Sequence, residues 1–517
     1  MVQKKQFPNI IFFMVDQLAA KWLEISETGI CDLPNIQRLK SGGTSFSNAI
    51  TSNPVCCAAR STLATGLTSR GHGVLENGYQ LDPDLPTFMR TLQESGWRTG
   101  AFGKVHLNPH FGGLYPDYHR YGFDVTHITE DARGGEWLDW VESEHPQHYQ
   151  AVLATIWPTE IPKYAAYSRK RNLQDRIKAI RQNFDWTTPE FPDSTPGAYA
   201  LPFPEEVSQT CWITMHALNF LRETPIDQPC YAHISYVQPH SPFCAPADYI
   251  HRIDPLTLPS PVPAEWESDP HAPAYFSGKT PVKPNWQLIR RNYFADLMHL
   301  DHQLGQVLDL LETQGRDQNT YIVFLSDHGE LLADHGFTGK EERHYDACIR
   351  VSLIVTGPGL RQGQICDDLV QLEDICPAVL EIANQSFPPM PRMGPYLKVE
   401  AEDLPQLPGK SLLPLCRGER LSDWRTAAYR GSYNAIRSVN PGDWAQTIRT
   451  DQYRYTIYPK QGGQLFDLQK DPDEQRNLVA DPDYLKIRQE LQYQLMELII
   501  LQVYPKTRRS LFALGVH

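Results

Sequence analysis

The sequence has few cysteines, no long apolar run and no excess of positive charge. Its 10 cysteines are spread over 517 residues without a Cys-x-x-Cys pair, which argues against a disulfide framework and against structural zinc. No stretch approaches the roughly 18 apolar residues of a membrane-spanning helix. Lys and Arg total 48 against 61 Asp and Glu, a net charge of −13. Nucleic acid is therefore not expected as a main partner, because binding to phosphates needs clustered cations.

The amino-terminal region also lacks the pattern of an export signal. The apolar run Ile10–Val15 is only six residues long and ends at Asp16, whereas a signal peptide needs a longer apolar segment and a cleavage site with small residues. Together with the low cysteine content, this predicts a soluble protein of a reducing compartment, the cytoplasm, with no membrane partner.

The composition and the order of apolar segments predict an α/β fold. Hydrophobic residues make up 41% and charged residues 21% of the chain, which suits a large buried core. Strands are expected over Asn9–Val15, Thr99–Phe102, Tyr231–Val237, Thr320–Leu325 and Val351–Val355. Helices are expected over Pro34–Lys40, from Ser61, and over Pro86–Glu94, Gln209–Arg222 and Asn292–Glu312. This alternation favours a large, mostly parallel sheet flanked by helices.

Two domains are expected. The first covers residues 1–420 and includes an insertion, about 130–204, in which regular patterning fails and Trp, Tyr and Pro are frequent. It includes one basic helix candidate near Arg169–Arg181. We expect this insertion either to lie over the active face or to be ordinary surface elaboration. The second covers 421–517 and is predicted to be a smaller antiparallel α+β subdomain with a final helix near Tyr484–Leu501.

Polar residues follow four of the predicted strands. They are Asp16-Gln17, Lys104-Val105-His106, His240 and Asp327-His328. Each alone is typical of a turn or a cap. Because the carboxyl ends of parallel strands meet at one edge of a sheet, we expect all four groups to converge there.

The segment Cys56–Gly66, CCAARSTLATG, resembles the sulfatase signature Cys-x-Pro/Ala-x-Arg followed by Leu and Thr-Gly. In this register Cys56 is the position that the family oxidises to formylglycine, Arg60 stands four residues later, and Cys57 is the variable position. The family usually has Pro where this chain has Ala58. The resemblance also implies a formylglycine-generating maturation enzyme as a partner.

Further segments resemble sulfatases in the same order along the chain. They are Pro8–Gln17, Gly103–Leu107, Pro239–Pro242, Ser326–Gly336 followed by Lys340, and Leu465–Leu478. This resemblance spans nearly the whole chain and implies the fold of the alkaline phosphatase superfamily, near choline sulfatases and phosphonate monoester hydrolases. It implies hydrolysis of a small-molecule sulfate ester to alcohol and sulfate.

The resemblance implies one divalent cation, held by Asp16, Gln17, Asp327 and His328. Three oxygen donors fit calcium, magnesium or manganese, and the imidazole favours manganese. Many sulfatases have a second Asp where this chain has Gln17. Choline sulfatases and phosphonate monoester hydrolases resemble the chain in having Gln there.

The resemblance to sulfatases also implies roles for the remaining site residues. The nucleophile would be a metal-bound hydroxyl of hydrated formylglycine at position 56, oriented by Arg60. Lys104 and Lys340 would bind sulfate oxygens. His106 would take the proton of the second hydroxyl, and His240 would protonate the leaving alcohol or bind sulfate; the two histidines could exchange these roles. Asn77 would contact substrate or form an Asn-Gly turn.

Two other functions stay open. One is a phosphonate monoester hydrolase or phosphodiesterase of the same superfamily, although Lys104 and His106 favour a sulfatase. The other is a non-catalytic homologue in which Cys56 is never modified. The alcohol part of the substrate is not specified, although the aromatic residues of the insertion would suit an aryl, sugar or quaternary ammonium group; they are Trp137, Trp140, Trp157, Tyr164 and Tyr167.

Two further features carry weaker expectations. His299, Asp301 and His302 have the spacing of metal ligands, but we place them on the polar flank of a long helix. The tail Tyr504–His517 mixes basic and apolar residues, and we expect it to pack on a second copy in a homo-oligomer.

Overall fold

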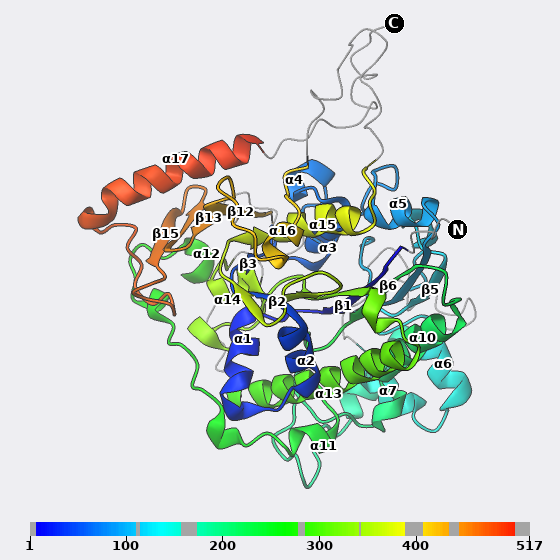
Figure 1. The fold of residues 1–517 in the computed structure, drawn as a ribbon. Helices are drawn as coiled ribbons and strands as arrows, with labels where there is room; N and C mark the ends of the chain where they lie inside the picture. Colours follow the sequence, from blue (N-terminus) through cyan, green and yellow to red (C-terminus); the bar gives the residue numbers. More distant parts are fainter. Residues whose placement is uncertain are drawn as a thin grey trace, which may run out of the picture.

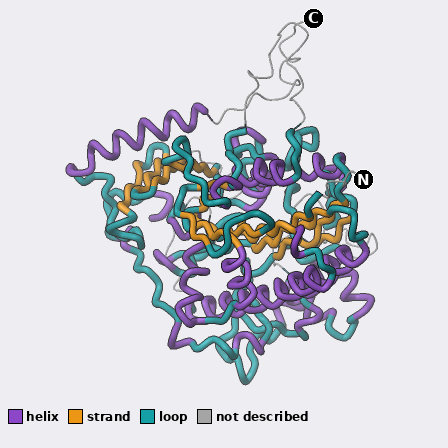
Figure 2. The backbone as a smooth tube through the Cα atoms, viewed as in Figure 1, coloured by secondary structure: helices purple, strands orange, loops and turns teal. Residues whose placement is uncertain are grey.

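The structure is a computed structural model of the chain. It describes residues 7–109, 114–156, 173–277, 285–340, 343–387, 407–433 and 444–501. A large sheet runs through the middle of the molecule, with helices on both faces and a smaller sheet at one end (Figures 1 and 2). Among the described residues, no helix has the length and apolar character needed to cross a bilayer.

The large sheet has the strand order β10-β2-β9-β7-β1-β6-β4-β5. Its strands, in chain order, are β1 (Asn9–Val15), β2 (Gly43–Phe46), β4 (Arg98–Gly103), β5 (Val125–Ile128), β6 (Cys230–Tyr236), β7 (Thr320–Ser326), β9 (Leu353–Thr356) and β10 (Gln364–Cys366). β1 is central and pairs in parallel with β6 and β7. The expected mostly parallel sheet is confirmed.

One strand, β9, runs antiparallel to both of its neighbours. The chain leaves β7 at its carboxyl edge, forms loops there and enters β9 from that same edge, so β9 must run the opposite way. The strand predicted over Val351–Val355 is in fact divided. Its first part is β8 (Arg350–Val351), which belongs to a separate three-stranded sheet with β3 (Ala49–Ile50) and β11 (Val370–Gln371).

The side chains of β1 alternate between two hydrophobic clusters, as expected for a strand buried on both faces. Ile11, Phe13 and Val15 belong to one cluster, and the residues between them belong to the other. The first cluster is covered by α1 (Ala20–Ile25), α2 (Pro34–Gly42), α10 (Gln209–Glu223), α11 (Ala247–Ile250) and α13 (Trp286–Thr313). The second is covered by α3 (Cys56–Thr65), α5 (Phe88–Glu94), α15 (Ile375–Ile382) and α16 (Leu413–Cys416).

The expected loss of regularity over residues 130–204 is only partly right: the basic helix predicted near Arg169–Arg181 is present over its described part, but the described part of this stretch has further helices. It contains α6 (Glu136–Glu144), α7 (Tyr149–Thr155) and α9 (Leu173–Asn183). These helices are short, so their apolar periodicity is hard to detect. Trp137 is buried in the first cluster, and its indole nitrogen donates to the Val207 carbonyl at 3.0 Å. It is therefore a core residue and not a substrate contact. Trp157, Tyr164 and Tyr167 lie outside the described residues.

The carboxyl-terminal part forms the expected antiparallel α+β unit. Its sheet consists of β12 (Ala427–Ser432), β13 (Ala445–Thr450), β14 (Tyr453–Tyr458) and β15 (Gly462–Asp467), paired in that order. Helix α17 (Leu485–Leu501) packs on this sheet through Leu491 and Leu495. The boundary at 420/421 stays a prediction, and the tail Tyr504–His517 lies outside the described residues.

Candidate active site

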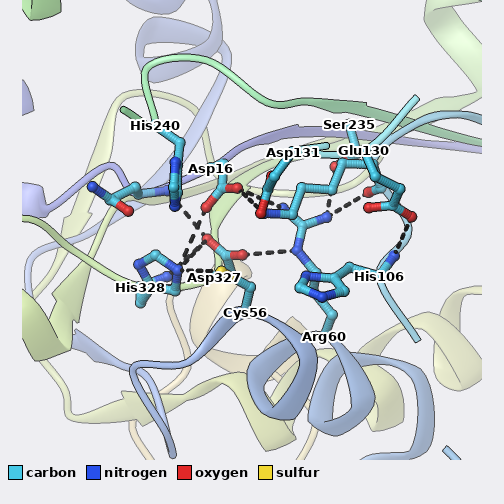
Figure 3. Close-up of polar contacts among 12 residues, drawn as sticks. Asp16, Cys56, Arg60, His106, Glu130, Asp131, Ser235, His240, Asp327 and His328 are labelled. Carbon is cyan, nitrogen blue, oxygen red and sulfur yellow. Dashed lines mark hydrogen bonds and ion pairs between the residues drawn. The ribbon is translucent and has the colours of Figure 1, made fainter. Parts of the chain in front are cut away.

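The four predicted strand-end groups meet at the carboxyl edge of the large sheet, next to the start of α3 (Figure 3). Asp16 follows β1, and Asp327 and His328 follow β7. The donor atoms of Asp16, Cys56, Asp327 and His328 all lie within 4.8 Å of one another, and all four residues are buried. Convergence follows from the parallel order β7-β1-β6-β4, because strands that run in one direction end at one edge.

Helix α3 begins at Cys56. The start near Ser61 that the sequence predicts is therefore wrong. The Val55 carbonyl accepts a hydrogen bond from the Ala59 amide at 2.9 Å, and the Asn77 side chain accepts one from the Cys57 amide at 3.0 Å. The first is the first hydrogen bond within the helix, and the second satisfies an amide that a helix start leaves without a partner. Asn77 lies in the expected turn with Gly78, and its carbonyl oxygen is used in holding α3.

Asp327 fixes the geometry of the site through both carboxylate oxygens. Oδ1 accepts from the backbone amides of Gln17 at 3.2 Å and His328 at 3.0 Å. Oδ2 accepts from Nε of Arg60 at 2.8 Å. The Nδ1 atom of His328 donates to the Gly329 carbonyl at 3.1 Å. In the neutral ring Nε2 therefore carries the lone pair, and it lies 3.0 Å from Sγ of Cys56.

The acidic oxygens and this imidazole nitrogen fit a divalent cation. Oδ1 of Asp16 is buried without a hydrogen-bond donor in the described structure, and it lies 3.4 Å from Nε2 of His328. Two lone-pair atoms this close repel each other unless a positive charge lies between them. Ligands about 2.4 Å from one cation, at right angles, are about 3.4 Å apart. Burial lowers the pKa of His328, but Asp327 outweighs burial and holds it above its ordinary value.

Two lysines, both buried, contribute positive charge to the same site. Nζ of Lys104 forms ion pairs with Asp16 and, at 2.6 Å, with Asp131. Nζ of Lys340 lies 2.8 Å from Oε1 of Gln17 and 3.2 Å from Sγ of Cys56. Burial acts to raise the pKa of the Asp16 carboxyl, but Lys104 outweighs it, so that pKa lies below its ordinary value.

The charges around Cys56 also act on its thiol. Burial by itself raises the pKa of Cys56, but Lys104, Lys340 and His328 outweigh it and hold the pKa well below its ordinary value. The next residue differs, because burial and the nearby Cys56 and Glu130 raise the pKa of Cys57 far above its ordinary value. Its Sγ donates to the Tyr79 carbonyl at 3.2 Å.

Arg60 lies on the same face of α3 as Cys56 and joins three strand ends. Beyond its contact with Asp327, its NH1 group donates to the Lys104 carbonyl and, at 2.9 Å, to Oγ of Ser235 on β6. Gly103 makes this arrangement possible. It has φ of 92°, and a Cβ atom there would lie 2.0 Å from the Ser235 carbonyl oxygen.

The two predicted catalytic histidines are both at the site. His106 has a backbone φ of 51°, its amide donates to Glu130 at 3.0 Å, and its buried side chain helps to lower the pKa of Cys56. His240 donates from Nδ1 to the Ser241 carbonyl at 2.8 Å. Burial lowers the pKa of His240 to about 4, so its imidazole is neutral at pH 7.

The sequence analysis missed three site residues. Glu130 holds His106 and accepts from the Tyr118 hydroxyl at 2.8 Å, Asp131 pairs with Lys104, and Ser235 binds Arg60. Glu130 and Asp131 follow β5, which the sequence analysis had not assigned as a strand. The available signal was weak: an acidic pair two residues after the short segment Val125–Ile128, in which only the first and last residues are apolar.

The chain is similar in sequence to known families over most of its length. A family model described as "Sulfatase" matches residues 8–385, and one described as "N-sulphoglucosamine sulphohydrolase, C-terminal" matches residues 333–500. An arylsulfatase of Clostridium perfringens is 27% identical, with 92% of this chain and 91% of that protein covered. A choline-sulfatase of Rhizobium meliloti is 25% identical, with 92% and 83% covered.

The fold is also similar to solved structures. A phosphonate monoester hydrolase of Agrobacterium radiobacter superposes with a TM-score of 0.75 at 23% identity, and the match covers 96% of each chain. The sulfatase model alone spans well over half of the sequence. The chain therefore belongs to the sulfatase family of the alkaline phosphatase superfamily, a family of sulfuric ester hydrolases.

Proposed function

We propose that this protein hydrolyses a sulfate monoester, using a formylglycine made from Cys56 and a divalent cation held by Asp16, Gln17, Asp327 and His328. The observation that carries the proposal is the position of the Cys56 sulfur, 3.0 Å from the His328 imidazole and 3.2 Å from the Lys340 ammonium. A side chain at this position faces both the cation ligands and a cationic group for an anionic substrate.

The cation and the formylglycine would supply the parts of the chemistry that ordinary amino acid side chains lack. The cation would neutralise charge on the sulfate oxygens, and hydrated formylglycine would offer two hydroxyls at position 56, one for attack on sulfur and one for later release of sulfate. Calcium and manganese both suit a donor set of three oxygens and one nitrogen. Because Cys56 is fully buried, we propose that the maturation enzyme acts before the chain folds.

The residues of this chain would bind and orient the sulfate group. Lys340 is well situated for this, since its ammonium lies beside the reacting position and its other partner is a neutral amide. Lys104 lies between Asp16 and Asp131, so it would hold these carboxylates as well as attract the anion. Arg60 would keep Asp327 in place and add positive charge where charge develops on oxygen.

The tautomer of His240 bears on the two histidine roles. Because Nδ1 must donate to the Ser241 carbonyl, the neutral ring presents an acceptor at Nε2. His240 is therefore suited to accept a proton, and His106, on the other side of Cys56, is suited to donate to the leaving alcohol. The two histidines would thus have the reverse of the roles first given to them, an alternative that the sequence leaves open.

Turnover of three substrates by one metal-loaded preparation would test the proposal. An aryl sulfate, a phenyl phosphonate monoester and an aryl phosphodiester should be compared by kcat/KM. We expect the sulfate to be preferred. Dominant turnover of the phosphonate or the phosphodiester would assign the site to the rival activity of the same superfamily, and no turnover of any would favour the non-catalytic alternative.

Mass spectrometry of the peptide that contains Cys56 tests the modification separately. The protein should be coexpressed with a formylglycine-generating enzyme, and the peptide should have the mass of an aldehyde at position 56. A free thiol in such a preparation would contradict the proposed nucleophile.

A further inference from the structure

A second group of potential metal ligands lies among the helices on one face of the large sheet. It consists of Glu205 in the short helix η5 (Glu205–Val207), Cys211 in the first turn of α10, and His299 in the middle of α13. One ligand atom from each lies within 4.8 Å of the other two. The group shares no residue with the candidate active site. The sequence analysis placed His299 on a polar flank, but its side chain is only 2% exposed.

The distances within this group match those of a tetrahedral zinc site. Sγ of Cys211 lies 3.6 Å from Nε2 of His299, and the same nitrogen lies 3.6 Å from Oε1 of Glu205. Around a tetrahedral zinc ion, with Zn–S near 2.3 Å and Zn–N near 2.1 Å, the sulfur and nitrogen ligands are about 3.6 Å apart. Nitrogen and oxygen ligands are about 3.4 Å apart in the same geometry. The imidazole nitrogen therefore already lies near the bound distance from both the sulfur and the carboxylate oxygen.

The chemical types of the donors point to zinc rather than to calcium or manganese. Sulfur and imidazole are preferred by zinc, whereas the oxygen-rich set at Asp16 and Asp327 suits harder cations. Burial lowers the pKa of His299 to about 3, so its ring is neutral and has a lone pair at pH 7. Burial also raises the pKa of Cys211 to about 12. Without a metal this cysteine is a neutral thiol, and a zinc ion would have to displace its proton.

The group has an outer layer of contacts and a route to solvent. The Tyr249 hydroxyl lies 2.8 Å from Nδ1 of His302 and 3.4 Å from Oε1 of Glu205. Nδ1 of His302 lies 4.0 Å from that same oxygen. Glu205, Tyr249 and His302 line a surface cavity of about 1050 Å³. A metal ion could enter through this cavity, and a fourth ligand could come from water or from His302.

We propose that the chain binds one Zn²⁺ through Cys211, His299 and Glu205, with the fourth position open toward this cavity. Binding forms a Zn–S bond, breaks the S–H bond of Cys211 and releases that proton to solvent, with no change in oxidation state. The ion joins the start of α10 to the middle of α13. Cys211 and His299 are 88 positions apart, which explains why no local cysteine motif indicates the site.

Cobalt(II) titration of the full-length protein tests the proposal without relying on turnover. The titration uses the Cys56→Ser variant, so that the active site contributes no sulfur ligand. We expect a thiolate-to-Co(II) charge-transfer band in the near ultraviolet, reversed by added Zn²⁺; the band reports this site alone, because the candidate active site of the variant has no sulfur ligand. The double variant that also has Cys211→Ser should lack the band. Adding Cys31→Ser should leave it unchanged, because Cys31 lines the same cavity without belonging to the ligand group.

Two outcomes would overturn the proposal: no thiolate band in Cys56→Ser, or a band that survives Cys211→Ser. Because Cys211→Ser could impair folding, His299→Gln serves as the second variant, and its thiolate band should need an at least about 100-fold higher Co²⁺ concentration. Unweakened binding in His299→Gln would also count against the site. The Cys211→Ser variant with Cys56 intact should keep its kcat/KM for aryl sulfate. This result separates the zinc site from the proposed sulfatase chemistry, which could fail without affecting cobalt binding.

Discussion

Two neighbouring cysteines at the start of α3 lie on different faces of the helix and have different electrostatic environments. Cys56 faces two carboxylates, an imidazole and two ammonium groups, and its pKa is held well below the ordinary value. Cys57 lies in an apolar cluster against the Tyr79 carbonyl, and its pKa is raised far above that value. Burial is complete for both. The surrounding charges, and not burial, therefore separate the reactive position from the structural one.

The largest expected effect comes from replacing the two cysteines one at a time. We expect Cys56→Ala to lower kcat/KM for aryl sulfate by at least about 10³-fold, because the nucleophile is lost. Cys57→Ala should retain activity within a factor of a few and lower the free energy of unfolding by about 1 kcal/mol. Steady-state kinetics and denaturant unfolding measure both. The opposite pattern of activities would show that the register of the signature is wrong.

Removal of the active-site cation should affect both the activity and the stability of the protein. After treatment with EDTA we expect activity to disappear and to return when Mn²⁺ or Ca²⁺ is added. At 100 times its dissociation constant the cation should stabilise the fold by about 2.7 kcal/mol, measured as a rise in Tm. An Asp16→Asn variant should lack both responses. An unchanged Tm in the native protein, with full activity in EDTA, would argue against a cation at this site.

A smaller loss is expected when Arg60 is replaced by Lys. Its guanidinium contacts Asp327, the Lys104 carbonyl and Ser235 together, and an ammonium cannot reproduce this planar arrangement. We expect kcat to fall about 100-fold, with little change in secondary structure by circular dichroism. Ser235→Ala, which removes only one of these contacts, should lower kcat much less. Equal kcat values for Arg60→Lys and the native enzyme would show that the contacts of Arg60 do not contribute to catalysis.

The smallest expected effect is at Asn77, which supports the helix from the Cys57 side. Loss of the hydrogen bond to the Cys57 amide in Asn77→Ala should lower the free energy of unfolding by about 1 kcal/mol. Asn77→Asp should preserve stability, because its carboxylate can accept the same hydrogen bond. A KM that rises in both variants without a loss of stability would instead support the substrate contact that the sequence suggested.

The sequence predicted the strands that form the site better than it predicted their surroundings. β1 and β7 are continuous apolar runs that end in polar residues, so Asp16 and Asp327 could be found from periodicity alone. Cys56 and Arg60 were found through a family motif. Glu130 and Asp131 were missed because β5 has only four residues. The start of α3 was misplaced because its support comes from Asn77, 20 positions beyond Cys57.

Position 103 has no room for a side chain, and this limits how the enzyme could be changed by evolution or design. Any side chain there would push apart β4 and β6, whose ends supply two of the groups that hold Arg60. Libraries that vary substrate preference should keep this position constant and place diversity in the surface loops. A mutational scan should then find Gly103 intolerant of even alanine, although the residue itself never meets the substrate.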